Sequence, residues 1–212
     1  MLLLLAVFAP FLAAPLAPLA ARRWGAKAGW PLALAFVPTL ALLVRVPAAF
    51  SGSPAAGQLT WVPGLELSLA FRADGFSLLF ALLVAVMGVL VTVYATAYLG
   101  ERERHGRFYG LLLLFAGAML GFVLADNLIA LFAFWELTSV ASFLLIGFWD
   151  DREAAQDGAV KAFVVTAAGG LALLVAVVLL SLAGGSVNLS ELDLAAVREG
   201  PAFKPELEYI NF

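Results

Sequence analysis

The sequence has 212 residues, of which 64% are hydrophobic and 13% charged, and its formal net charge at pH 7 is −3. Its mean hydropathy of +1.02 lies far outside the range of soluble globular domains and indicates an integral membrane protein. The absence of cysteine and the single histidine exclude disulfides and iron–sulfur centres, so we expect no cofactor and no metal site, and the scattered basic residues leave no footprint for nucleic acid.

Six apolar runs are long enough to cross a bilayer as helices, which takes about 20 largely apolar residues each. They cover approximately residues 2–21, 31–50, 75–99, 108–125, 128–148 and 159–183. Prolines in the first two runs are predicted to bend or end those helices. The sequence therefore predicts an all-α polytopic membrane protein whose transmembrane bundle occupies residues 1–183.

The connectors indicate an orientation in the membrane. If the connectors after the first, third and fifth runs are cytoplasmic, that side holds eight of the twelve basic residues. These eight are Arg22, Arg23, Lys27, Arg102, Arg104, Arg107, Arg152 and Lys161. The positive-inside rule then places the N-terminus outside. The first run lacks a basic segment before it, so we expect it to be a helix that is retained and not a cleaved signal peptide.

The connector at residues 51–72 differs from the others. It is rich in Gly and Pro and ends in an alternating pattern from Leu65 to Arg72. This pattern predicts a loop that leads into a short strand or β-hairpin on the outer surface.

The residues after the sixth run, 184–212, are predicted to form an extracellular or periplasmic short helix and tail. Two consecutive glycines end the long helix, and residues 188–199 are predicted to form a surface helix capped by Asn188 or Ser190. Residues 200–212 have a loop-like composition.

Glu136 lies in the middle of the fifth run. At a rise of about 1.5 Å per residue it is roughly 12 to 14 Å from one end of the run and about 20 Å from the other, near the centre of the hydrocarbon layer. A carboxylate costs at least about 2.5 kcal/mol there, so such residues usually face a protein interior or a hydrated path and carry protons or ions. Ser139, one turn along, would make the same face slightly polar. The alternative is a structural hydrogen bond between two helices.

Lys161 is the second candidate for proton translocation. It lies near the start of the sixth run, where its ammonium group could line a hydrated cytoplasmic route with Thr166 one turn further in. The alternative is that Lys161 extends only to the membrane interface.

Asp74 and His105, like Ser139 and Thr166, are candidate accessory sites. Asp74 has the character of a helix N-cap beside Arg72, and Asp126-Asn127 similarly marks the start of the fifth helix. His105 is predicted to be solvated in a charged surface loop, where an imidazole could collect protons. No nucleotide-binding or nucleophile motif is present in the sequence, so we expect no enzyme active site in this chain.

Several segments resemble a known family. They are Asp126-Asn-Leu-Ile-Ala-Leu-Phe-Ala-Phe-Trp-Glu136-Leu-Thr-Ser, Lys161-Ala-Phe-Val-Val-Thr166 and Arg72-Ala-Asp-Gly-Phe-Ser77. Together they are similar to the antiporter-like membrane subunits shared by Mrp-type cation/proton antiporters and respiratory complex I. The Trp-Glu-Leu-Thr-Ser form and Gly169-Gly170 are most similar to the A-type Mrp subunits.

This resemblance implies a bacterial cell-membrane subunit of a multisubunit sodium/proton antiporter, with Glu136 in the proton pathway and protons and Na⁺ as the transported ions. It also implies a larger helix bundle, with a partner lysine on a seventh helix that would follow Phe212, and other subunits of a membrane complex as partners. Lys161 matches a sixth-helix lysine of the family and is not that partner. A proton-pumping subunit of complex I and a structural membrane scaffold remain as alternatives.

Overall fold

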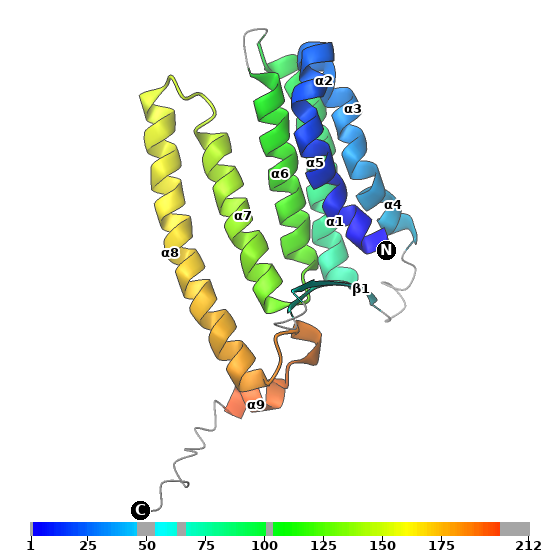
Figure 1. Ribbon diagram of the computed structural model, residues 1–212, viewed down its shortest axis with the longest axis vertical. Helices are drawn as coiled ribbons and strands as arrows, with labels where there is room; N and C mark the ends of the chain where they lie inside the picture. Colours follow the sequence, from blue (N-terminus) through cyan, green and yellow to red (C-terminus); the bar gives the residue numbers. More distant parts are fainter. Residues whose placement is uncertain (1, 46–53, 63–66, 101–103, 200–212) are drawn as a thin grey trace, which may run out of the picture.

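The computed structural model describes residues 2–45, 54–62, 67–100 and 104–199. Long helices run side by side, and a two-stranded sheet lies across one end of them (Figure 1). We call this end, which also carries the starts of the helices α5 (Gly75–Tyr98) and α7 (Leu128–Ile146), the sheet end. The opposite end, where α6 (His105–Leu124) starts and the chain turns from α7 into α8 (Glu153–Gly184), is called the loop end.

The first predicted span and the described part of the second form an antiparallel hairpin of broken helices (Figure 1), while residues 46–50 of the second lie outside the described residues. The ascending arm consists of α1 (Leu2–Ala13), η1 (Ala14–Leu16) and α2 (Ala17–Trp24), and the descending arm of η2 (Gly25–Ala28), α3 (Gly29–Leu32), η3 (Ala33–Phe36) and α4 (Val37–Arg45). Prolines lie in the first turns of η1 and α2, as the sequence predicts. Gly25 turns the chain with φ +56°, a conformation that favours glycine.

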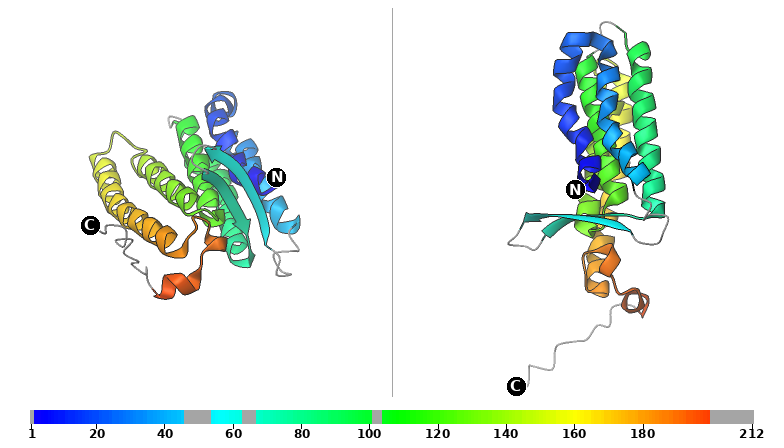
Figure 2. Two further views of the ribbon diagram at one scale, coloured as in Figure 1. Left: turned by 60° about the horizontal axis from the view of Figure 1, so that its bottom comes forward. Right: turned by 90° about the vertical axis from the view of Figure 1, so that its right-hand side faces the viewer.

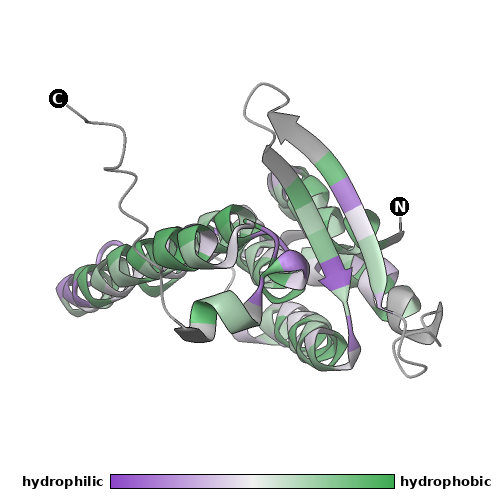
Figure 3. Cartoon of the chain, turned by 90° about the horizontal axis from the view of Figure 1, so that it is seen from below, coloured by the Kyte–Doolittle hydropathy of each residue, from purple (hydrophilic) through white to green (hydrophobic). Residues whose placement is uncertain are grey.

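Four long helices complete the bundle: α5 (Gly75–Tyr98), α6 (His105–Leu124), α7 (Leu128–Ile146) and α8 (Glu153–Gly184). Each is long and apolar enough to cross a membrane, so the protein is a multi-pass membrane protein. The helix α8 begins at Glu153 and not near residue 159, because the polar residues before its apolar run are also helical. An acidic residue in the first turn complements the helix dipole there. Hydrophilic colour gathers mainly at the turns and on the sheet (Figure 3).

The predicted hairpin is confirmed. Strand β1 (Ala55–Val62) pairs antiparallel with β2 (Leu67–Ala73), and the pair lies crosswise to the helices (Figure 2). Backbone pairing continues beyond β2, because the Asp126 N–H donates to Ala70 O at 2.8 Å and the Leu189 N–H donates to Asp126 O at 2.6 Å. Three segments distant in sequence are thereby joined at the sheet end.

The single surface helix predicted for residues 188–199 is wrong in detail. The segment divides into η6 (Leu189–Glu191) and α9 (Leu194–Glu199), because Leu192 is extended. The cap of α9 is Asp193, whose Oδ1 accepts from the backbone N–H groups of Ala195 and Ala196 at 2.9 and 3.2 Å. The tail predicted for residues 200–212 lies outside the described residues.

Close packing among α1 to α7 depends on aromatic rings lying over glycines. A Cβ at Gly88 of α5 would lie 2.5 Å from the Phe36 ring, and one at Gly117 of α6 would lie 2.9 Å from the Phe11 ring. Gly121, four residues after Gly117, receives the ring of Phe134 from α7. The two glycines of this GxxxG pattern therefore admit rings from two different helices.

Candidate functional site

Glu136 lies on α7 and its carboxylate packs against Gly170 of α8. The side chain is partly buried. Among the described residues, Glu136 takes part in no ion pair and no hydrogen bond. Within the described chain the carboxyl thus has no partner and lies between two helices that are each apolar enough to cross a membrane, an arrangement typical of proton-carrying residues.

Nearer the loop end, α7 and α8 contact each other through aromatic rings. There the rings of Phe143 and Phe163 pack with centroids 5.2 Å apart. Thr166 lies one turn from Gly170, and its hydroxyl donates to the carbonyls of Ala162 and Phe163 at 3.0 Å. Because Thr166 and Gly170 are four residues apart, they share the face of α8 that meets α7.

Ser139 is buried one turn from Glu136, and its hydroxyl donates to the Trp135 carbonyl at 3.2 Å. The Thr138 hydroxyl donates to the same carbonyl at 2.7 Å. The indole Nε1 of Trp135 is buried, and it has no hydrogen-bond partner within the described part of the chain. The predicted polar character of this side of α7 is therefore present, although both hydroxyl protons are directed to the helix backbone.

Lys161 is exposed and lies on α8 nine residues before Gly170 (170 − 161 = 9). Nine residues make about two and a half helical turns and a rise of roughly 13.5 Å. Lys161 therefore lies on the face of α8 opposite to Gly170 and far from Glu136 along the axis. The structure does not bring these two predicted site residues together, nor does it align Lys161 with Thr166.

Asp74 is the N-cap of α5, as predicted. Its Oδ1 accepts from the Ser77 N–H at 2.8 Å, while the Asp74 N–H donates to Ser77 Oγ at 2.9 Å. The hydrogen bond from the Ser77 backbone lowers the pKa of the Asp74 carboxyl, with a minor contribution from the Arg72 charge. Asn127 likewise caps α7 by accepting from the N–H groups of Ile129 and Ala130.

The prediction of a solvated His105 is wrong. His105 is the first residue of α6 and is only 9% exposed, and its Nε2 has no partner among the described residues. The cause is a long-range contact: a Cβ at Gly106 would lie 2.7 Å from Pro18 Cα, so the start of α6 packs directly on α2.

At the loop end, two arginines pair with one carboxylate. Arg104 and Arg107 donate to Asp150 Oδ2 at 2.7 and 2.9 Å. Both hydrogen bonds lower the pKa of the Asp150 carboxyl, and the bond from Arg107 contributes most. The pairs join the start of α6 to the α7–α8 connector.

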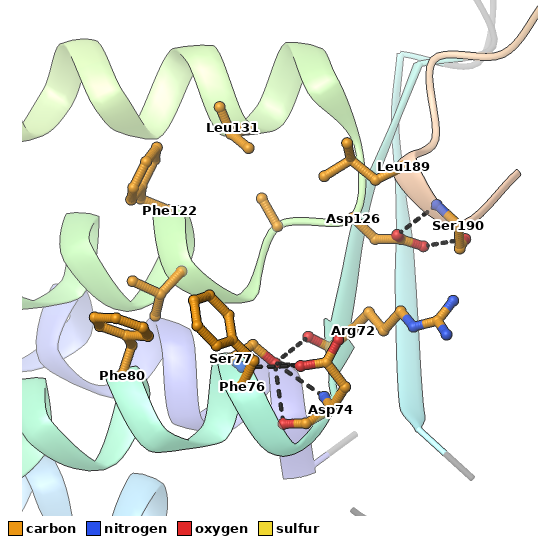
Figure 4. Close-up of a pocket in the computed structure, with 12 residues that line it drawn as sticks. Arg72, Asp74, Phe76, Ser77, Phe80, Phe122, Asp126, Leu131, Leu189 and Ser190 are labelled. Carbon is orange, nitrogen blue, oxygen red and sulfur yellow. Dashed lines mark hydrogen bonds between the residues drawn. The ribbon is translucent and has the colours of Figure 1, made fainter. Parts of the chain in front are cut away.

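A cavity of about 580 Å³ lies at the sheet end between α5, α6, α7 and η6 (Figure 4). Its rim carries Arg72, Asp74, Asp126 and Ser190, and its wall is largely apolar and includes three phenylalanine rings. Asp126 accepts hydrogen bonds from the Ser190 N–H at 3.0 Å and its hydroxyl at 2.6 Å. No local sequence pattern predicts this cavity, because its lining comes from distant segments. No group of three or more potential metal ligands was found among the described residues.

Known proteins resemble the chain over nearly its whole length. The family described as "NADH:quinone oxidoreductase/Mrp antiporter, TM" matches residues 125–208, and "NADH-Ubiquinone oxidoreductase (complex I), chain 5 N-terminus" matches residues 60–109. The "Na(+)/H(+) antiporter subunit A1" of Staphylococcus haemolyticus is 41% identical over 206 residues, or 95% of this chain. The chain belongs to the family of antiporter-like membrane subunits.

Chains in solved structures of membrane complexes share the fold. A chain in the Mrp complex from Dietzia sp. DQ12-45-1b superposes with a TM-score of 0.81 at 37% identity, covering 90% of this chain and 20% of that one. A chain of respiratory complex I from Thermus thermophilus gives a TM-score of 0.73 at 27% identity, covering 90% and 38%. The chain spans 26% of the length of the Staphylococcus haemolyticus relative, about a quarter. The resemblance based on the Trp135-Glu136 motif is thus confirmed.

Proposed function

We propose that this chain contributes a proton pathway to a multisubunit sodium/proton antiporter of a bacterial cell membrane, and that Glu136 is its proton-carrying residue. One observation carries the proposal. The Glu136 carboxylate lies near the middle of α7, against α8, without an ion-pair or hydrogen-bond partner in the described residues. A group that is not held in a fixed pair is free to take up and release a proton as its surroundings change.

The similarity to relatives named Na(+)/H(+) antiporter subunit A1 and to a chain of an Mrp complex supports sodium and protons as the exchanged ions. Those relatives are about four times as long as this chain, which supports further helices of the same bundle and other complex subunits as partners. The role is that of a transporter subunit without catalytic chemistry.

In this proposal the loop end faces the cytoplasm and the N-terminus faces outward. The basic residues after the first, third and fifth predicted spans support this orientation, since those connectors all lie at the loop end (Figure 1). The sheet end, with its cavity and the segment around α9, would then lie at the outer surface. Lys161 would serve a cytoplasmic route formed with helices beyond α8, because it faces away from Glu136.

The test is Glu136→Gln in the assembled complex, with sodium-dependent proton exchange measured in everted membrane vesicles. Exchange is expected to fall about 100-fold or more, as when a proton-transferring group is removed. Glu136→Asp keeps a carboxyl and should retain part of the activity. Glu153→Gln, at an exposed position in the first turn of α8, is the matched control and should leave exchange unchanged.

The same experiment separates the alternatives. Normal exchange in the Glu136→Gln variant would refute the proposal. Exchange that requires NADH would indicate a respiratory pump of the complex I type. The similarity in fold to a chain of respiratory complex I is the reason for this alternative. If Glu136→Gln abolishes both subunit assembly and exchange, Glu136 is a structural bridge between helices.

A further inference from the structure

Gly170 is the residue of α8 that meets the Glu136 carboxylate. The three heavy atoms nearest to a Cβ built at Gly170 all belong to Glu136, namely Oε1, which would overlap with it, Cδ at 3.1 Å and Oε2 at 3.6 Å. Gly170 is buried, whereas most of its neighbours along α8 are exposed. The carboxylate therefore fills the space that a side chain at Gly170 would occupy.

The preceding residue provides a direct contrast. Gly169 is exposed, and a Cβ built there would meet no atom within 4 Å. Both glycines lie within a continuous α-helix from Glu153 to Gly184, so neither is needed for a turn or a left-handed conformation. What distinguishes them in the structure is the carboxylate against Gly170.

We propose that Gly170 is a positioning residue for Glu136: its lack of a side chain keeps a slot on α8 in which the carboxyl group resides. The inference rests on the proposed function of Glu136. It extends that proposal by naming the feature of α8 that fixes where the proton-carrying atoms lie.

A methyl group at this position would move the carboxyl and not the helix. The three atoms nearest to it lie at the far end of a side chain with several rotatable bonds, and none of the three belongs to the backbone of α7. The cheapest response is rotation of the Glu136 side chain out of the slot. The packing of Phe143 on Phe163 nearer the loop end does not involve Gly170 and would keep α7 and α8 together.

No titratable side chain of the described neighbouring elements faces the slot. Those of α6 are His105, Arg107 and Tyr109, all in its first two turns, and those of α8 are Glu153, Asp157 and Lys161, at least nine residues before Gly170. Arg72 on β2 lies at the sheet end, on the rim of the cavity there. The location of the Glu136 carboxyl is thus the local variable that substitution of Gly170 changes.

The experiment compares Gly170→Ala with Gly169→Ala in the assembled complex. Both substitutions raise helix propensity equally, so a difference between them reports on the slot. Gly170→Ala should assemble normally but shift the pH of half-maximal sodium/proton exchange by about half a unit or more, because the carboxyl moves to a site of different solvation. Gly169→Ala should match the wild type. The rate at which dicyclohexylcarbodiimide labels Glu136, followed by mass spectrometry, should change in Gly170→Ala alone.

One double variant, together with Glu136→Gln, separates the outcomes. Glu136→Asp/Gly170→Ala withdraws the carboxyl by about one carbon–carbon bond, roughly 1.5 Å, and should restore the pH profile of Glu136→Asp alone. The inference is overturned if Gly170→Ala behaves like Gly169→Ala, or if it blocks assembly, which would assign Gly170 to helix packing. If Glu136→Gln abolishes exchange while Gly170→Ala has no effect, the inference alone fails. If Glu136→Gln exchanges normally, the proposed function fails.

Discussion

The helices α1 to α6 and the pair α7–α8 are packed on different principles. In the most apolar stretch of α6, 44% of residues are buried within the described chain, against 11% in α8. In the first region rings fill the space over glycines: Phe36 covers Gly88 and Phe11 covers Gly117. At the α7–α8 interface the group that fills the space over a glycine is a carboxylate.

Glycine therefore has two uses in this bundle. A ring over a glycine gives a close, apolar contact that excludes water and fixes two helices. A carboxylate over a glycine gives a polar contact that can rearrange, because the side chain is flexible and unpaired among the described residues. The exposed apolar residues of α8, such as Leu171, Val175 and Leu182, leave a broad surface for neighbouring helices or lipid. The first region provides the rigid support, and the second holds the candidate proton site.

The largest loss of stability is expected when a closely packed glycine in α1 to α6 is replaced by alanine. A Cβ at Gly29 would overlap with the Thr92 backbone carbonyl and lie 2.6 Å from Thr96 Cγ2 and 2.8 Å from Tyr109 Oη. Since a backbone atom cannot swing aside, we expect Gly29→Ala to lower the free energy of unfolding by about 1–3 kcal/mol or more, measured by thermal unfolding in detergent.

The matched control for Gly29→Ala is Gly158→Ala on α8. Nothing lies within 4 Å of a Cβ at Gly158, and the residue is helical. The free energy of unfolding of Gly158→Ala should equal that of the wild type or exceed it by up to about 0.5–1 kcal/mol, because alanine has the higher helix propensity. Equal melting of Gly29→Ala and wild type would contradict the distinction between the two regions.

Much of this arrangement follows from sequence patterns that are local. Hydropathy predicts the long helices, alternation predicts the hairpin, and residue type predicts the caps Asp74 and Asn127. The position of Glu136 at mid-helix needs only counting along the chain. Each of these properties depends on residues within one element.

The features that sequence reasoning missed depend on contacts between distant segments. His105 is buried because Gly106 meets Pro18, and the cavity at the sheet end combines α5, α6, α7 and η6. The helical period places Lys161 and Gly170 on opposite faces of α8, but it does not say which face meets α7. That choice is made by the fit of the Glu136 carboxylate and the Phe143 ring onto α8.

The exposed face of α8 can be tested through Lys161. Because Lys161 points away from Glu136, Lys161→Ala should lower sodium/proton exchange less than Glu136→Gln does, by about tenfold or less, the range of a modest electrostatic coupling. Lys161→Arg keeps the charge and serves as the control. Full exchange in Lys161→Ala would favour an interfacial anchor without a transport role, and complete loss would place Lys161 on the main route.

The smallest effect is expected at the start of α5, where a cap stabilises a helix end of the rigid region. Asp74→Ala removes the acceptor of the Ser77 N–H and should cost about 0.5–1 kcal/mol, the lower part of the range for N-caps, because the site is exposed. Asp74→Asn keeps an acceptor of similar capping strength but removes the charge.

The lowered pKa of Asp74 gives this comparison a pH dependence. A carboxyl with a lowered folded-state pKa contributes stability above its unfolded value of about 3.9, and this contribution is lost as pH falls through the folded value. Thermal unfolding at pH 7 should therefore rank wild type slightly above Asp74→Asn, and the gap should close below about pH 4. A gap that persists at low pH would show that the charge is not its source, and the cap would then act through hydrogen-bond geometry alone.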